Sequence, residues 1–146
     1  MIEFNPIGTI YTPFKDAEGM PIQPAGAQGI RGTIELLPEY AAGLQDLHGF
    51  SHIILLYVFH HSNSYSLVVT PFMDSTPRGL FATRAPNRPN SIGLSVVRLL
   101  QVDDAKLHIE GIDVLNGTPL LDIKPYAPEF DHPSGTVRTG WLEKSK

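Results

Sequence analysis

The feature that most restricts the fold of this chain is the frequency of its turn-forming residues. Glycine and proline each occur 13 times in 146 residues and divide the sequence into short apolar segments. This spacing excludes a bundle of long helices, because both residues disfavour helix interiors. The length is that of one domain. Because cysteine is absent, the chain has neither disulfides nor thiolate sites.

Most segments between these turns have the composition or the alternation of β-strands. We expect strands at residues 7–11, 30–37, 51–60, 66–70, 79–83, 94–103, 107–114 and 119–123. Residues 38–47 predict one short helix that begins with a proline. The run at 51–60 is continuously apolar, which is typical of a strand buried on both faces. The sequence therefore predicts an all-β fold: a single β-barrel of about eight short strands with at most one short helix. We expect the barrel domain in residues 1–130 and a C-terminal tail in residues 131–146.

The charge balance limits how the chain meets nucleic acids and membranes. Eleven basic and 15 acidic residues give a formal net charge of −4, which argues against indiscriminate binding to nucleic acid. The apolar runs are shorter than the roughly 18–20 residues of a membrane span, and residues 1–5 do not resemble a signal peptide. We therefore expect a cytoplasmic protein that binds no membrane. A local basic patch forms if the fold gathers five residues at one barrel mouth: Arg78, Arg84, Arg88, Arg98 and Lys124.

The segment FATRAPNRPNSIGLS, residues 81–95, concentrates groups that recognise anions and base edges. Its two prolines restrict the backbone, so Arg84, Arg88 and Asn90 are expected to point in defined directions. An arginine fork suits a carboxylate or a phosphate, and an asparagine amide suits a base edge. The alternative is a rigid turn whose arginines pair with nearby carboxylates.

A second candidate segment begins at Asn116 and Gly117, a pair that is typical of a hairpin turn. A glycine in such a turn also lets a ligand approach the backbone closely. Further along the chain, Asp122 and Tyr126 can orient or accept a proton, and Lys124 can bind a phosphate. The alternative for Asp122 and Lys124 is an ordinary surface ion pair.

Two histidines end the most apolar segment, and we expect no metal site there. His60 and His61 are adjacent, and adjacent residues of a strand point to opposite faces. The spacing of the histidines matches no zinc motif. Residues 23–29 are small throughout, which is typical of a mobile loop.

Four longer segments are specific enough to indicate a family. They are IGTIYTPF at 7–14, FSHIILLYVFHH at 50–61, FATRAPNRPNSIGLS at 81–95 and GIDVLNGTPLLDIKPY at 111–126. Together they resemble the TsaA-like family, whose best-known members are TrmO-type tRNA methyltransferases. In two places the chain differs from the family pattern: Asn116 replaces the aspartate of DGTP, and Ser91 replaces a proline.

The resemblance implies a β-barrel homodimer that uses S-adenosylmethionine. The implied reaction is methylation of N6 of threonylcarbamoyl-adenosine at position 37 in the anticodon loop of tRNA. The positions that match the family's cofactor contacts are Pro24, Ala25, Gly26, His60, His61, Arg84, Leu94, Asn116, Gly117, Thr118 and Pro119.

Methyl transfer to a ureido-type nitrogen requires loss of its proton. We expect Asp122, or Tyr126 through a partner, to accept that proton. Arg88, Asn90 and Lys124 are expected to bind the substrate, with arginine holding the threonyl carboxylate or a phosphate. Two alternatives stay open: a small-molecule methyltransferase on the same barrel, and a non-catalytic module that binds S-adenosylmethionine as a sensor or binds RNA.

Overall fold

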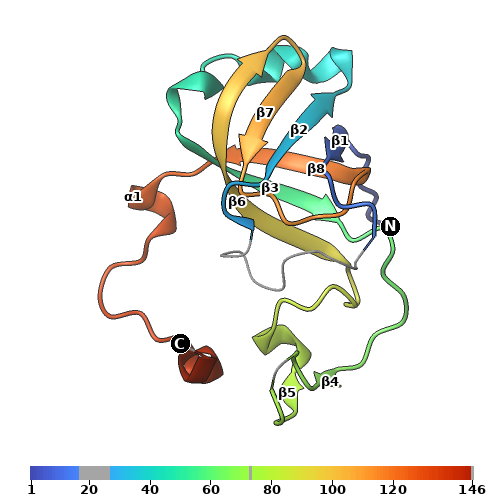
Figure 1. Cartoon of the computed structure of the whole chain (residues 1–146), viewed down its shortest axis with the longest axis vertical. Coiled ribbons are helices and arrows are strands. Elements are labelled where there is room, and N and C mark those ends of the chain that lie inside the picture. Colours follow the sequence, from blue (N-terminus) through green and yellow to red (C-terminus); the bar gives the residue numbers. More distant parts are fainter. Residues whose placement is uncertain (17–26, 73, 146) are drawn as a thin grey trace.

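The strands of the protein close into one barrel in the computed structural model, which describes residues 1–16, 27–72 and 74–145 (Figure 1). The barrel order is β1-β2-β7-β6-β3-β8, and all neighbouring strands are antiparallel. The barrel strands are β1 (Gly8–Tyr11), β2 (Arg31–Leu36), β3 (His52–Val58), β6 (Ile92–Asp103), β7 (Lys106–Glu110) and β8 (Thr118–Pro125). The prediction of a single all-β barrel is confirmed.

Alternation along each strand fills the barrel with aliphatic side chains. On β3, the inward residues Ile53, Leu55 and Tyr57 are at most 3% exposed. The residues between them, such as Ile54 and Leu56, are only half-buried. The expectation that this strand is buried on both faces is wrong, because a barrel strand turns one face to the core and the other outward.

One end of the barrel is covered by two 3₁₀ segments, η2 (Pro38–Leu44) and η3 (Leu47–Gly49). Leu44 and Leu47 are buried against the core there. The helix expected at residues 38–47 is therefore two 3₁₀ pieces. Asp46 separates them in the left-handed conformation (φ 69°), a backbone geometry that a continuing right-handed helix cannot contain.

Two further strands lie outside the barrel in an arm, defined here as residues 66–83 and drawn below the barrel in Figure 1. It contains β4 (Val68–Val69), β5 (Arg78–Gly79) and the 3₁₀ turn η4 (Leu80–Ala82). The prediction of a strand at residues 79–83 is wrong except at Gly79, the last residue of β5. The Thr83 amide and hydroxyl both donate to the Leu80 carbonyl, and this local turn replaces a strand ladder.

After the barrel the chain forms α1 (Pro128–Asp131) and the 3₁₀ segment η5 (Gly140–Ser145). The tail expected at residues 131–146 thus carries a short helical segment, while its boundary with the barrel domain stays a prediction. Within the described part of the chain, every helix is too short or too polar to cross a membrane.

Candidate functional site

The end of the barrel opposite η2 and η3 gathers most of the predicted site residues. Val58 at the end of β3 pairs with Ile92 at the start of β6, and Tyr57 pairs with Leu120 near the start of β8. Three segments next to these strand ends therefore meet at this end of the barrel, called here the mouth. They are residues 59–63, 84–91 and 111–117. The cofactor contacts predicted at Pro24, Ala25 and Gly26 lie outside the described residues.

Three hydrogen bonds join the turn at residues 59–63, named here the histidine turn, to the loop at residues 84–91, named here the arginine–asparagine loop. The Phe59 amide donates to the Ser91 carbonyl at 2.9 Å. The Asn63 amide donates to Asn87 Oδ1 at 3.1 Å, and the hydroxyls of Ser62 and Ser91 lie 2.8 Å apart. The structure therefore brings together two predicted segments that are more than twenty residues apart in the chain.

Arg88 stiffens this loop from within. Its Nη1 donates to the carbonyls of Thr83 and Ala85, both at 3.0 Å. The guanidinium also lies 5.9 Å from the centroid of the Phe81 ring, a cation–π distance. The Arg84 and Asn90 side chains are exposed by contrast. The substrate roles of Arg88 and Asn90 stay predictions.

The turn at Asn116 and Gly117 starts β8 and is fastened to β1. Asn116 Oδ1 accepts from the Thr12 amide at 3.0 Å, and the Gly117 amide donates to the Ile10 carbonyl at 2.9 Å. Gly117 has a φ of 86°, which favours glycine. The turn is not a hairpin, because β8 pairs with β1 and β3 rather than with β7. Of its neighbours, Thr118 is 3% exposed and Pro119 is half-buried.

The rings of the two histidines lie against each other at a tilt of 52° instead of pointing to opposite faces. Strand β3 ends at Val58, so His60 and His61 belong to a turn, with ring centroids 4.2 Å apart. The pKa of His60 is lowered from its usual value, first by burial and then by the charge of His61. A neutral imidazole is thereby favoured at the mouth.

Removing the second ring tests this cause. We expect His61→Ala to raise the pKa of His60 part of the way toward the usual 6.5, because the like charge disappears and the contacting ring no longer shields His60 from water. NMR titration of the His60 ring protons measures the midpoint. Ser64→Ala, at an exposed neighbour, serves as the control, and an unchanged midpoint in His61→Ala contradicts the stated cause.

The predicted base does not share this mouth. Asp122 Oδ2 lies 2.9 Å from the Lys124 Nζ, as in the ion-pair alternative. Asp122 also borders an open pocket of about 400 Å³ beside η2 and η3, the other end of the barrel. Tyr126 lies nearby in a T-shaped arrangement with His52, and their ring centroids are 6.4 Å apart. Asp122, Lys124 and Tyr126 thus lie near one another and away from Asn116. Their predicted roles, in proton transfer and in substrate binding, stay predictions.

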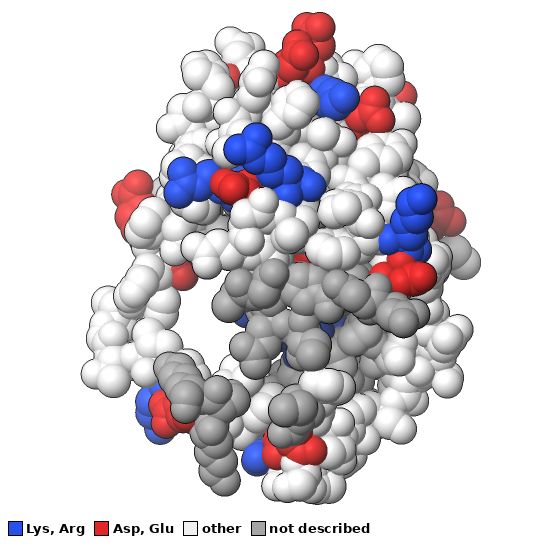
Figure 2. All heavy atoms as spheres, viewed as in Figure 1, with Lys and Arg blue, Asp and Glu red and all other residues white. Residues whose placement is uncertain are grey.

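The expected basic patch does not form at the mouth, because three of its five members lie elsewhere with carboxylate partners. Arg78 pairs with Asp74, Arg98 with Glu110 and Lys124 with Asp122. On the face shown in Figure 2, basic side chains lie next to acidic ones in small groups that are separated by uncharged areas. Arg84 and Arg88 are the members of the set that lie in the loop at the mouth.

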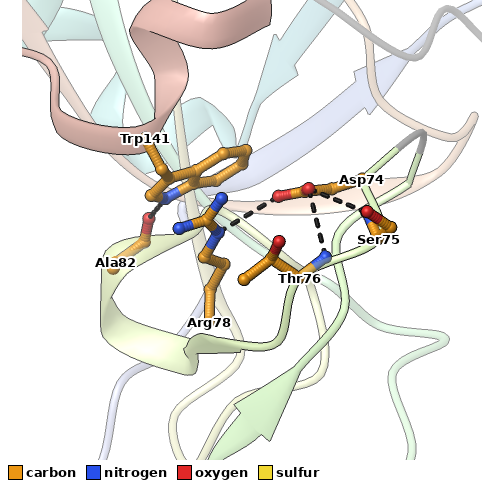
Figure 3. Close-up of polar contacts among 6 residues, drawn as sticks. All are labelled: Asp74, Ser75, Thr76, Arg78, Ala82 and Trp141. Atoms are coloured by element: carbon orange, nitrogen blue, oxygen red, sulfur yellow. Dashed lines mark hydrogen bonds and ion pairs between the residues drawn. The ribbon is translucent and has the colours of Figure 1, made fainter.

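The tail contacts the arm through Trp141 (Figure 3). Trp141 Nε1 donates to the Ala82 carbonyl at 2.8 Å, and the Arg78 guanidinium lies 5.3 Å from the indole centroid. Arg78 in turn binds Asp74 at 3.1 Å. This contact is not predictable from the sequence, since no local pattern relates residues 141 and 82.

Sequence reasoning also missed three polar residues near the mouth. The hydroxyls of Tyr57 and Ser95 lie 2.8 Å apart, and Ser95 Oγ donates to Asp113 Oδ1 at 3.0 Å. The alternation of β6 offered a signal, because it turns Ser95 inward among apolar residues. The same alternation turns Leu94 outward, where it is 45% exposed. Within the described residues, no group of three or more histidines or acids is placed to hold a metal ion.

Comparisons with known proteins identify the family. The family model described as the tRNA-methyltransferase O N-terminal domain matches residues 9–132. A Pyrococcus abyssi protein named "Probable S-adenosyl-L-methionine-binding protein" is 53% identical over 145 residues, which are 99% of this chain and 78% of that protein. The human tRNA (adenine(37)-N6)-methyltransferase is 36% identical over 142 residues and matches 91% of this chain.

A crystal structure of TrmO from Pseudomonas aeruginosa is similar in fold as well as in sequence. It superposes with a TM-score of 0.80 at 40% identity and covers 97% of this chain. The chain spans 62% of that crystallised protein and 32% of the human relative. Because the family model matches most of its residues, this chain belongs to the family of the tRNA-methyltransferase O N-terminal domain.

Proposed function

We propose that this protein is a cytoplasmic tRNA methyltransferase that uses S-adenosylmethionine to methylate N6 of threonylcarbamoyl-adenosine at position 37. The observation that carries the proposal is the meeting of three segments at one mouth: the histidine turn, the arginine–asparagine loop and the Asn116–Gly117 turn. Each contains residues that match the family's cofactor contacts. Relatives of this chain are named for binding S-adenosylmethionine and for methylating adenine 37 of tRNA.

The residues at the mouth fit such a donor. A Cβ built on Gly117 meets no atom within 4 Å, so the backbone there faces open space that a ligand can enter. The favoured neutral form of His60 avoids repelling a sulfonium cation, and the exposed Arg84 can pair with a carboxylate. The donor supplies an electrophilic methyl group, which leaves the protein mainly the task of alignment.

The arm and Tyr65, which directly precedes it, offer surfaces for the acceptor RNA. Phe81 is 74% exposed, Phe72 68% and Tyr65 50%. Unpaired bases of RNA loops stack on exposed aromatic rings, and Arg84 follows Phe81 closely in the same loop. We assign the threonyl carboxylate of the acceptor to Arg88 of the loop at residues 84–91, since guanidinium forks match carboxylates.

The outer face of β6 supports a homodimer. Its outward residues Ile92, Leu94 and Val96, named here the β6 stripe, are 40%, 45% and 45% exposed and adjoin the mouth. Contiguous exposed apolar residues mark interaction surfaces. A second copy packed on the stripe would bring Leu94 next to a shared cofactor site, as its predicted cofactor contact requires.

Mass spectrometry of tRNA nucleosides tests the function. The purified protein is incubated with S-adenosylmethionine and with tRNA that carries threonylcarbamoyl-adenosine. We expect one added methyl group on that nucleoside, and none on tRNA that lacks the threonylcarbamoyl group. Methylation only in a metabolite extract favours the small-molecule alternative. Calorimetric binding of the donor without any transfer favours the non-catalytic module.

A further inference from the structure

A chain of three polar side chains leads from the barrel interior to the mouth. Tyr57 is 3% exposed and Ser95 9% exposed, and their hydroxyl oxygens lie 2.8 Å apart. Ser95 Oγ then donates to Asp113 Oδ1 at 3.0 Å. Asp113 is only half-buried, so the chain ends where a ligand at the mouth can reach it.

The direction of the two hydrogen bonds follows from the groups involved. An ionised carboxylate only accepts, so Ser95 uses its single proton on Asp113. Tyr57 must therefore donate to Ser95. Burial above all raises the pKa of Tyr57 to about 12, which keeps this donor protonated throughout the usual pH range. The hydroxyl protons of Tyr57 and Ser95 thus both point along the hydrogen bonds toward the Asp113 carboxylate.

The surrounding structure holds these groups in place. Gly93 leaves room for the Tyr57 ring, because a Cβ at this position would overlap Tyr57 Cε1. The residues on either side of Asp113 in the sequence are buried, Ile112 with 0% exposed and Val114 with 4% exposed. The Val114 carbonyl also accepts from Thr12 Oγ1 at 2.8 Å. A carboxylate fixed by its backbone and by a buried donor resembles the oriented bases of other enzymes.

A purely structural role explains the hydrogen bonds among Tyr57, Ser95 and Asp113 less completely. The hydrogen bond between Tyr57 and Ser95 uses one of their two hydroxyl protons, so the pair needs one further acceptor. A neutral carbonyl would satisfy that proton, whereas Asp113 is an acid that stays only half-buried. Asp113 also lies on the segment that leads to Gly117, at the mouth where the predicted cofactor contacts gather. Asp122, in contrast, already binds Lys124 at 2.9 Å and lies toward the other end of the barrel.

We propose that Asp113 is the proton acceptor of the methyl transfer and that Ser95 and Tyr57 are its positioning residues. This inference rests on the proposed function. The N6 electron pair forms the new bond to the methyl carbon, the carbon–sulfur bond breaks, and its electron pair returns to sulfur. The N6 proton passes to the Asp113 carboxylate, so charge and atoms balance without another reactant.

Single-turnover methylation of tRNA that carries threonylcarbamoyl-adenosine tests the assignment. We expect Asp113→Asn to lower the transfer rate by about 10²–10⁴-fold, the usual contribution of a general base. Binding of S-adenosylmethionine, measured by calorimetry, and the melting temperature should change little. Asp104→Asn is the matched control, because Asp104 lies in the β6–β7 hairpin at the other end, and asparagine suits its left-handed backbone (φ 52°).

The positioning residues have a separate signature. We expect Ser95→Ala to lower kcat about tenfold, the loss of one hydrogen bond to a charged group, while KM for tRNA and donor affinity stay unchanged. A wild-type rate in Asp113→Asn overturns the inference, and so does a large loss in Asp122→Asn alone. An inactive wild-type protein instead overturns the proposed function, and the inference falls with it.

Discussion

Replacing Gly8 by alanine lowers the melting temperature by about 5 °C. A Cβ at this position would lie 2.9 Å from Leu36 Cα and closer still to the Glu35 carbonyl oxygen. These are backbone atoms of β2, so the clash is relieved only by opening the β1–β2 ladder at its Gly8–Leu36 pair. Overpacking of this kind costs about 1–3 kcal/mol, and each kcal/mol shifts the midpoint by about 2–4 °C in a chain of this size.

Differential scanning calorimetry measures the effect, and Gly43→Ala is the matched control. A Cβ on Gly43 meets no atom within 4 Å, so that variant should melt with the wild type. If Gly8→Ala melts with the control, then β1 does not pack against β2 as closely as the structure has it. An equal loss in both variants would point to a general effect of replacing glycine rather than to this contact.

Replacing Val96 by aspartate separates the proposed homodimer into single chains. Val96 is at the end of the β6 stripe and is 45% exposed in the single chain. In the proposed dimer the new carboxylate would be buried without a partner, a change that costs about 3–5 kcal/mol. We therefore expect the dissociation constant to rise at least about 100-fold.

Sedimentation equilibrium measures the dissociation, with Gln101→Asp as the control. Gln101 is an exposed residue of the same strand outside the stripe, in the part that pairs with β7. Calorimetry adds a second measurement, because donor affinity should fall together with the dimer if Leu94 reaches the cofactor of a second copy. A dimer that survives Val96→Asp places the interface elsewhere, and a wild-type monomer refutes the proposed homodimer.

The family and the barrel class were accessible from the sequence alone. The motifs around Arg84 and Gly117 are long enough to indicate the family, and the family model confirms the relationship. The apolar pattern likewise placed five of the barrel strands close to their observed positions, whereas the strand expected at residues 107–114 ends at Glu110. Both signals are local, because each depends on residues within about 15 positions of one another.

Errors arose where neighbouring residues do not decide the outcome. Thr83 bonds back to Leu80 and ends a predicted strand, and His60 lies beyond the last strand residue, Val58, rather than within the strand. Local alternation cannot distinguish a strand end from a turn when both are apolar or aromatic. The predicted base has the same weakness, since Asp122 is close to Gly117 in the sequence but β8 carries it away from the mouth.

By itself, therefore, the sequence determined the class of fold, the family and the segments that carry its chemistry. Only the tertiary structure decided which of these segments share one mouth of the barrel, and it joined Ser95 to Asp113 from different parts of the chain. The physical reason is barrel closure. Pairing of β3 with β6 and with β8 sets which strand ends meet, and those pairings depend on packing between residues that are distant in sequence.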